Sequence, residues 1–331
     1  MSTARKVVMI GILDPALEIE RAILEPLGVE LIPHEYRSED DVIAAAYDAV
    51  AVTTVIAPIT RRVIEHLVNC RLVVKCGVGF DNIDVEAATE HGICVVNVPD
   101  YGIDEVATHT LALILNSLRH IADITEAVRR GEWVSTPPYP IQRSAGQVLG
   151  IVGFGRIGRS LAQKTRGFAW RLLVHDLFVD AETIRGYGAE PVDLDTVLTQ
   201  ADFVVLHVPL TKQTHHLIDA KALDKMKSTA FLVNTSRGGV VDSQALYRAL
   251  QGGRIAGAAL DVLEEEPPSN DHPLLSCARA LVTSHVAWYS VQAVNDLRLK
   301  AAEEIARMLR GEPPLNPVNA TVRTHLNQRE V

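Results

Sequence analysis

Three polar segments in the second half of the chain each follow a short apolar run. Residues 234–239 contain Arg237, residues 261–267 contain Glu266, and residues 283–288 contain His285. Because ligands bind outside the carboxyl ends of parallel strands, we expect these side chains to meet at one edge of a sheet. A guanidinium can hold a carboxylate through two hydrogen bonds, an imidazolium can donate a proton, and a carboxylate favours a protonated imidazole beside it. This set predicts the reduction of a 2-oxo acid, whose ketone must gain a proton as a hydride arrives.

Each member of this set has an alternative interpretation. Arg237 could be an ordinary surface arginine, and His285 is one of 12 histidines, most of which we expect to be structural or exposed. Glu266 ends the acidic run 264–266, and such a run is typical of a solvated face. We therefore keep Glu264 open as an alternative partner for the histidine.

A glycine pattern near the middle of the chain predicts a dinucleotide site. An apolar run opens into Gly153, Gly155 and Gly158, which have the spacing G-x-G-x-x-G. The first glycine makes a tight turn, the second lets the backbone approach a pyrophosphate, and the third lets the next helix pack close to its strand. A glycine-rich turn without a ligand is the alternative.

The next apolar run supports the dinucleotide interpretation. It ends in Asp176, about 20 residues past the glycines, where a carboxylate that binds the ribose 2′-hydroxyl is expected. No Arg or Lys follows Asp176 before Arg185, so no nearby cation is available for a 2′-phosphate. The sequence therefore predicts NAD, and not NADP, as the cofactor.

Two further segments are candidates for substrate binding. The segment Gly77, Val78 and Gly79 can present backbone N–H groups to a carboxylate, which requires a close approach that glycine permits. A simple turn is the alternative there. Trp288 follows His285 and either forms a wall of the substrate pocket or belongs to the core.

The adjacent pair His215–His216 raises the question of a metal site. Neighbouring residues on a strand point to opposite faces, and no third ligand is evident in the sequence. We therefore predict no metal. The four cysteines have no C-x-x-C spacing, which predicts reduced thiols and a cytoplasmic protein.

The composition is that of a globular protein. The chain has 331 residues, of which 47% are hydrophobic and 22% are charged, and this length predicts two domains. The formal net charge is −9 and no basic patch is visible, so we expect no direct binding of nucleic acid. No apolar stretch approaches the about 18–20 residues of a membrane span, so we expect no membrane partner.

Apolar runs alternate with helical patterns along the whole chain. Strands are predicted over residues 6–12, 29–33, 49–54, 71–76, 93–98, 148–152, 171–176, 202–208, 230–234, 256–261 and 280–283. Helices are predicted over residues 84–90, with Asp84 as the N-cap, 104–130 and 290–310. The fold class is therefore α/β, with two doubly wound parallel sheets, the second of which has the six strands of a dinucleotide-binding domain.

The last helical pattern has no sheet of its own, so we expect it to return to the first domain. This predicts a discontinuous substrate-binding domain of residues 1–100 plus 289–331 and an NAD-binding Rossmann domain of residues 101–288. The cleft between them is the expected substrate site.

These motifs together resemble the D-isomer-specific 2-hydroxyacid dehydrogenase family over nearly the whole chain. The matching features are residues 77–84, the glycine pattern, Asn-x-x-Arg-Gly-Gly at 234–239, Glu-Pro at 266–267 and the histidine at 285. The resemblance implies a flavodoxin-like substrate domain, a Rossmann domain, and Arg237, Glu266 and His285 as the catalytic residues. Ser284, where the family usually has proline, and Thr108, where many members have an acid, depart from the pattern.

Two short segments resemble the C-terminal-binding-protein branch of this family more than phosphoglycerate dehydrogenase. They are His-His-Leu-Ile at 215–218 and Ala-Trp-Tyr-Ser at 287–290. Two hypotheses follow: an NAD-dependent enzyme that interconverts a 2-oxo acid and the D-2-hydroxy acid, and an NAD(H)-sensing, corepressor-like binding protein with weak dehydrogenase activity. An enzyme of this family that oxidises phosphonate or formate is a weaker third hypothesis.

The resemblance assigns further residues to each ligand and implies a homodimer through the region 104–130. The implied cofactor contacts are Gly153, Gly155, Arg156, Ile157, Gly158, Asp176, Val208, Pro209, Thr235, Ser236 and Asp261. The implied substrate contacts are Val78, Gly79, Tyr101, Arg237 and Trp288. Neither the side chain of the substrate nor the direction of the reaction in the cell follows from the sequence.

Overall fold

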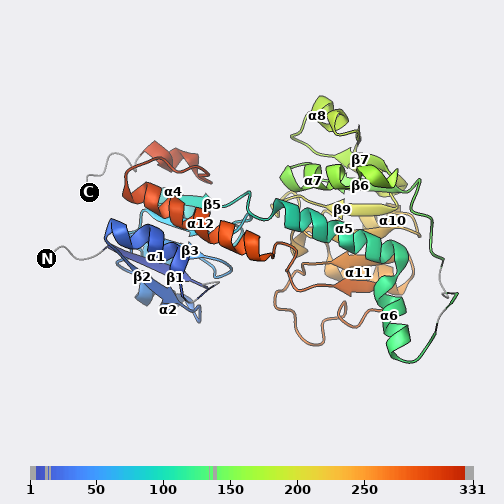
Figure 1. Ribbon diagram of the computed structural model, residues 1–331, viewed down its shortest axis with the longest axis horizontal. Helices are drawn as coiled ribbons and strands as arrows, with labels where there is room; N and C mark the ends of the chain where they lie inside the picture. Colours follow the sequence, from blue (N-terminus) through green and yellow to red (C-terminus); the bar gives the residue numbers. More distant parts are fainter. Residues whose placement is uncertain (1–4, 12–13, 15, 134, 137–139, 325–331) are drawn as a thin grey trace. The chain divides into compact units, whose positions relative to one another are not determined.

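The computed structural model describes residues 5–11, 14, 16–133, 135–136 and 140–324. The chain forms two compact units, Met1–Gly102 with Ser290–Val331, and Ile103–Tyr289. Each unit is an α/β domain built on its own parallel sheet, as Figure 1 shows.

The sheet of the first unit has five strands. They are β1 (Arg5–Ile10), β2 (Val29–His34), β3 (Ala51–Thr54), β4 (Leu72–Lys75) and β5 (Cys94–Asn97). All neighbours are parallel and the order is β2-β1-β3-β4-β5. This is the flavodoxin-like order, so the predicted fold of this unit is confirmed. The first predicted strand extended to residue 12, which lies outside the described residues.

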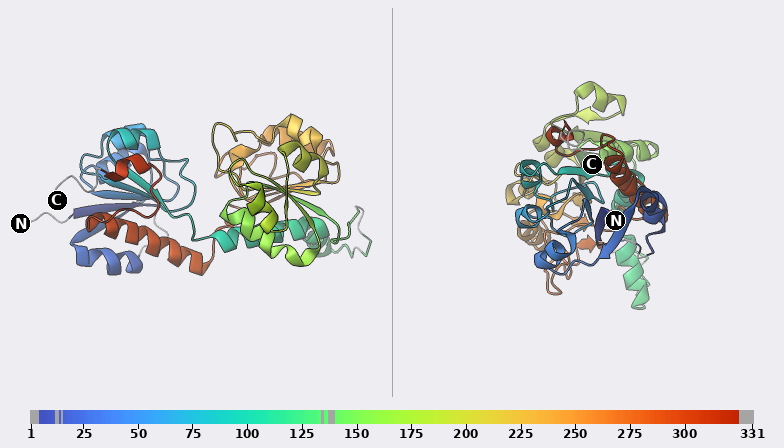
Figure 2. Two further views of the ribbon diagram at one scale, coloured as in Figure 1. Left: turned by 90° about the horizontal axis from the view of Figure 1, so that it is seen from above. Right: turned by 90° about the vertical axis from the view of Figure 1, so that its left-hand side faces the viewer.

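Helices cover both faces of this sheet (Figure 2). They are α1 (Glu18–Leu24), α2 (Glu39–Ala46), α3 (Arg61–Glu65), α4 (Val85–Glu90) and α12 (Val291–Leu309). Alternate strand residues form one buried cluster with α2, α3 and α4, while α1 packs against α12. Arg298 of α12 is only 7% exposed and binds both carboxylate oxygens of Glu20 on α1, at 2.8 and 2.7 Å. The predicted cap of α4 is confirmed, because the Asp84 carboxylate accepts the N–H of Ala87 at 2.8 Å.

The sheet of the second unit has seven strands. They are β6 (Val148–Val152), β7 (Arg171–His175), β8 (Glu190–Pro191), β9 (Phe203–Leu206), β10 (Phe231–Asn234), β11 (Gly257–Leu260) and β12 (Ala280–Val282). The order is β12-β11-β10-β9-β6-β7-β8, with parallel neighbours throughout. This is the order 3-2-1-4-5-6 of dinucleotide-binding sheets with β12 added at one edge. The prediction of six strands missed β8, which has two residues, ends in Pro191 and lies at the other edge, where proline is tolerated.

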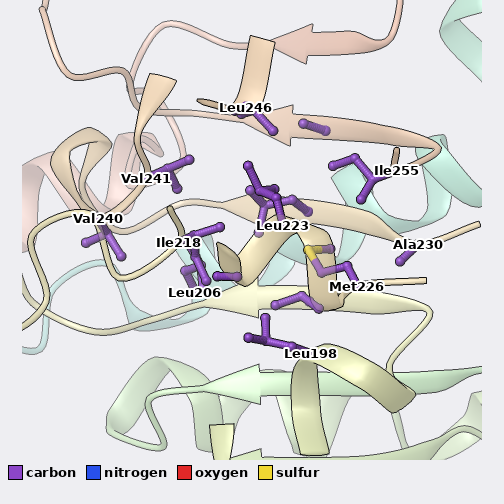
Figure 3. Packing of buried hydrophobic residues seen from close by; sticks show 14 of the residues in the cluster. Leu198, Leu206, Ile218, Leu223, Met226, Ala230, Val240, Val241, Leu246 and Ile255 are labelled. Atoms are coloured by element: carbon purple, nitrogen blue, oxygen red, sulfur yellow. The ribbon is translucent and has the colours of Figure 1, made fainter. Parts of the chain in front are cut away.

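Two layers of helices cover this sheet. They are α5 (Ile103–Arg119), α7 (Arg156–Lys164), α8 (Ala181–Gly186), α9 (Leu194–Gln200), α10 (Ala220–Lys225) and α11 (Ser243–Gln251), while α6 (Ile121–Arg129) follows α5 along the chain. One face forms a buried cluster with α9, α10 and α11, part of which Figure 3 shows around Leu206, Leu223 and Leu246. Alternate strand residues on the other face pack against α5 and α7. The doubly wound architecture is therefore confirmed.

The prediction of one continuous helix over 104–130 was wrong. His120 has a left-handed φ of 52° and separates α5 from α6. The Asn116 side chain accepts the N–H of Ala122 at 2.9 Å, which replaces a helical partner at the break, while the apolar periodicity continues across it. Within the described part of the chain, every helix is too short or too polar to cross a membrane.

Candidate active site

The strands of the second unit all point the same way, so their carboxyl ends share one edge of the sheet. The loops that leave this edge begin at Gly153, Asp176, His207, Thr235 and Asp261, and the loop after β12 carries His285. This edge therefore brings together the glycine pattern and the three polar segments of the second half, as parallel strands require.

The three glycines are needed for three different reasons. Gly153 has a φ of 96°, and a Cβ there would lie 2.6 Å from the carbonyl carbon of His207. A Cβ on Gly158 would lie 2.4 Å from the carbonyl oxygen of Gly153. By contrast, apart from the adjoining backbone, no heavy atom of the described residues lies within 4 Å of the Cβ position of Gly155, which is the N-cap of α7 and provides no side-chain cap. The first and third glycines thus permit close packing, and the second leaves open space at a helix N-terminus, where an anion is favoured.

Asp176 lies directly after β7 and holds the glycine loop. Its Oδ2 accepts the N–H of Phe154 at 2.6 Å, and its Oδ1 accepts the N–H groups of Phe178 and Val179 at 2.7 and 2.9 Å. Partial burial opposes ionisation, but these backbone donors outweigh it, so the pKa of Asp176 lies below its usual value. A carboxylate has about four acceptor positions, so this anion can still accept from a ribose hydroxyl.

His207 was not singled out from the sequence, although it lies at the same edge. Among the described residues, neither of its buried ring nitrogens has a hydrogen-bond partner. Burial lowers the pKa of His207 to about 4, so the ring is neutral at pH 7. Its backbone forms the surface against which Gly153 packs, and the predicted cofactor contacts Val208 and Pro209 follow it in the same loop.

Hydrogen bonds of the Asn234 side chain shape the turn that carries Arg237. The Asn234 Oδ1 accepts from the backbone and the hydroxyl of Ser236, at 3.0 and 2.8 Å, and Asn234 Nδ2 donates to the Arg237 carbonyl at 2.9 Å. A Cβ on Gly238 would lie 1.9 Å from the carbonyl of Leu263. Glycine therefore lets the Arg237 turn lie directly against the loop that carries Glu266, and the Arg237 charge contributes to lowering the pKa of Glu266.

Glu266 and His285 form a close pair. Glu266 Oε2 lies 2.6 Å from His285 Nδ1, and Glu266 Oε1 accepts the N–H of Leu263 at 2.9 Å. Partial burial opposes ionisation of Glu266, but the hydrogen bond from His285, the charges of His285 and Arg237 and the Leu263 N–H outweigh it, so its pKa is lowered. The bond at Nδ1 leaves Nε2 of His285 as the ring nitrogen for another ligand. Both side chains are about one-third exposed, at 34% and 39%.

Glu264, the alternative partner of His285, contacts His216 and Ser243. Its Oε1 lies 2.6 Å from His216 Nε2, and its Oε2 accepts the N–H of Ser243 at 2.8 Å.

The premises for predicting no metal at His215–His216 were wrong. The pair lies in a turn where His216 has a φ of 52°, the two rings stack with centroids 3.9 Å apart, and Glu264 is a third potential ligand.

The predicted cofactor contact Asp261 is buried, with 1% of its surface exposed, and it organises the loop after β12. Its Oδ1 accepts from the Thr283 hydroxyl and the Val286 N–H, at 2.5 and 3.0 Å, and its Oδ2 accepts the Ala287 N–H at 2.9 Å. Its carbonyl accepts the N–H of His285 at 2.7 Å. Asp261 thus fixes the backbone around His285, which has a left-handed φ of 55°.

The predicted substrate contacts lie in both units. In the first unit, Val78 and Gly79 follow β4, and the Val78 carbonyl accepts from Asn97 at 2.6 Å, while Tyr101 lies just after β5 and is half-buried. In the second unit, Trp288 is half-buried and its ring meets that of Tyr289 edge to face, with centroids 5.7 Å apart. Trp288 therefore belongs neither to the buried core nor to the fully exposed surface.

The second unit also matches a known domain. Residues 111–287 match the NAD-binding domain of the D-isomer specific 2-hydroxyacid dehydrogenases. The chain belongs to this family. NAD is therefore the cofactor, and the open space beside Gly155 together with the ionised Asp176 fits the pyrophosphate and the ribose of that cofactor.

Known dehydrogenases resemble the chain over most of its length. It is 37% identical to a glyoxylate reductase of Pyrococcus furiosus, over 94% of this chain and 97% of that protein. It is 39% identical to a D-3-phosphoglycerate dehydrogenase of Methanocaldococcus jannaschii, over 94% of this chain but only 59% of that protein. A D-lactate dehydrogenase of Aquifex aeolicus, solved with NAD and lactic acid, has a TM-score of 0.85 and 27% identity, covering 94% of this chain and 98% of that one.

Proposed function

We propose that this protein is an NAD-dependent dehydrogenase that interconverts a 2-oxo acid and the D-2-hydroxy acid. The observation that carries the proposal is the pair of Glu266 and His285, 2.6 Å apart, beside Arg237 and at the sheet edge that bears the NAD loop. A protein that only senses NAD(H) has no chemical need for an acid–base pair there.

Bound NADH would supply the hydride for the reduction, and the residues of this chain would position the substrate and provide the proton. The Arg237 guanidinium holds the substrate carboxylate and polarises the ketone. His285 gives the proton from Nε2 to the carbonyl oxygen, because its Nδ1 is held by Glu266. The anionic Glu266 stabilises the imidazolium before transfer. In the oxidation, neutral His285 takes the hydroxyl proton of the D-2-hydroxy acid.

The other predicted contacts take supporting roles in this proposal. Asp176 would bind the ribose of NAD, and the backbone N–H groups of Arg156 and Ile157 at the start of α7 would bind its pyrophosphate. The remaining cofactor contacts are Val208, Pro209, Thr235, Ser236 and Asp261. Val78 and Gly79 offer backbone N–H groups to the substrate carboxylate, and Tyr101 and Trp288 limit the space for the substrate side chain.

The test is the consumption of NADH with glyoxylate, hydroxypyruvate, phenylpyruvate and 4-methylthio-2-oxobutyrate. We expect turnover of at least one, and His285→Ala should remove most of it at every pH while NADH still binds. Turnover by His285→Ala at the wild-type rate would exclude His285 as the proton donor.

The corepressor-like hypothesis rests on His-His-Leu-Ile at 215–218 and Ala-Trp-Tyr-Ser at 287–290, which resemble the C-terminal-binding-protein branch. In that case the protein would bind NAD(H) and a protein partner and turn over 2-oxo acids only slowly. Intact NADH binding without turnover on the whole panel would favour this alternative over the enzyme.

We also propose a cytoplasmic homodimer. On α6, Ile121 and Val128 are 54% and 43% exposed, and Trp133 beyond it is 87% exposed, which gives an apolar surface that a second copy could cover. Within the described residues no disulfide joins any of the four cysteines, and burial raises the pKa of Cys70 to about 12, as expected for an unreactive reduced thiol. A 36.1 kDa species in sedimentation at micromolar concentration would contradict the dimer.

A further inference from the structure

Two consecutive residues of α5 bind the two loops that carry Arg237 and His285. The hydroxyls of Thr110 and Thr235 lie 2.8 Å apart in a buried contact, and Thr235 precedes Arg237 by two residues. His109 Nε2 lies 3.1 Å from the hydroxyl of Thr283, and Thr283 precedes His285 by two residues. One helix thus contacts both loops at the edge of the sheet, although neither residue is among the predicted site residues.

The direction of the hydrogen bonds at Thr283 can be deduced. Asp261 Oδ1 lies 2.5 Å from the Thr283 hydroxyl, and a carboxylate can only accept, so the single hydroxyl proton is donated to Asp261. The Thr283 oxygen must then accept from His109, which places a proton on Nε2 of His109. The chain of donors therefore runs from His109 to Thr283 to Asp261.

This chain ends on the backbone of the histidine loop. Asp261 accepts the N–H groups of Val286 and Ala287 through its carboxylate and that of His285 through its carbonyl. His285 has a left-handed φ of 55°, a conformation that is unfavourable for a residue with a side chain. The three hydrogen bonds from the N–H groups of His285, Val286 and Ala287 to Asp261 stabilise this conformation.

We propose that His109 is a positioning residue for His285, acting through Thr283 and Asp261, and that Thr110 holds the Arg237 loop on the same helix. Because the two residues are consecutive on α5, they fix the spacing between the proton donor and the carboxylate-binding arginine. His109 is 25% exposed in its side chain and is not a core packing residue. This inference rests on the proposed function, since it gives His109 a role in proton transfer.

The test compares His109→Leu with His109→Gln, whose amide N–H can replace the Nε2–H donor, and uses Thr108→Ala as the control. Thr108 is exposed on the same helix, and its hydroxyl contacts Asp104 one turn earlier at 3.5 Å. We expect His109→Leu to lower kcat by about three- to tenfold, the effect of one lost neutral hydrogen bond, with NADH affinity within about twofold of wild type. His109→Gln should restore at least half of the lost rate, and Thr108→Ala should match wild type.

An unchanged kcat in His109→Leu, or equal losses in the Leu and Gln variants, would overturn the proposal. A second measurement does not depend on activity: a double-mutant cycle of His109→Leu and Thr283→Val in chemical unfolding. Each single variant should raise the unfolding constant by some factor. If the two side chains interact, the double variant should raise it by a factor at least about threefold smaller than the product of the two single factors. Additive effects would refute the contact itself, whereas a wild-type protein without turnover would refute the proposed function and leave the cycle as the test of the contact.

Discussion

Replacing Glu266 by glutamine tests the proton donor most sharply, because it removes one charge and keeps the shape of the side chain. The lowered pKa of Glu266 means that this carboxylate is ionised throughout the working range of pH, so the substitution removes a full negative charge. Any stabilisation that Glu266 gives the fold is present above the usual glutamate pKa and is lost as pH falls through its lowered value. The effect on activity at neutral and alkaline pH is therefore separate from acid unfolding.

The magnitude follows from the contact between Glu266 Oε2 and His285 Nδ1, at 2.6 Å. A hydrogen bond to a charged group contributes about 1.5–3 kcal/mol, and solvent screens this pair because its side chains are 34% and 39% exposed. We therefore take about 1.4 kcal/mol for the interaction that the substitution removes, and this free energy corresponds to a shift of about one pH unit in the activity profile. Loss of the carboxylate disfavours the protonated imidazole, so the protonated form persists only to a lower pH.

The assay is kcat/KM against pH in both directions. The alkaline limb for reduction, which needs protonated His285, should move down by about one pH unit in Glu266→Gln. The acidic limb for oxidation, which needs neutral His285, should move down by the same amount. Glu265→Gln removes the same charge from the exposed neighbouring residue and should move neither limb by more than a few tenths. If both limbs stay in place in Glu266→Gln, the carboxylate does not act on the histidine and the assignment of the pair fails.

Three other substitutions test the cofactor and substrate sites. Asp176→Asn keeps an acceptor oxygen for the glycine loop but removes the charge that repels a 2′-phosphate. The preference for NADH over NADPH, measured as the ratio of kcat/KM values, should therefore fall by about tenfold. Equal use of both cofactors by the wild type would contradict this. Gly155→Ala places a methyl group where nothing lies within 4 Å, so the melting temperature should hold while the Kd for NADH rises by about tenfold or more; unchanged NADH binding would remove the pyrophosphate from that space. Arg237→Lys should raise KM for the oxo acid and lower kcat, with NADH affinity near wild type, because lysine lacks the planar fork; an unchanged KM would exclude Arg237 from the substrate site.

Much of the fold was predictable because its signals are local. A buried parallel strand is a short apolar run, and the polar residue after it marks the carboxyl edge where ligands bind, as at Asp176 and Arg237. β8 was not predicted, because a strand of two residues that ends in Pro191 has no such apolar run. The break between the helices at His120 was not predicted, because the apolar periodicity continues across it. The Asn116 side chain accepts the Ala122 N–H in place of a backbone carbonyl, and no local pattern announces such a contact.

The organisation of the site depended on contacts between distant residues. Only the resemblance, through Pro267, favoured Glu266 over Glu264; in the structure Glu264 contacts His216 and Glu266 contacts His285. His215 and His216 share a side because His216 has a left-handed backbone, which a strand pattern does not foresee. His109 is 174 residues from Thr283, and no local pattern connects a helix to a loop at that separation.

The most direct test of the whole account is the reaction itself, with NADH, a 2-oxo acid panel and the chirality of the product. We expect at least one of the four acids to be reduced, with one NADH oxidised per product and the D-2-hydroxy acid as the product. NADH that binds with no turnover of any acid, or a product of the L configuration, would contradict it.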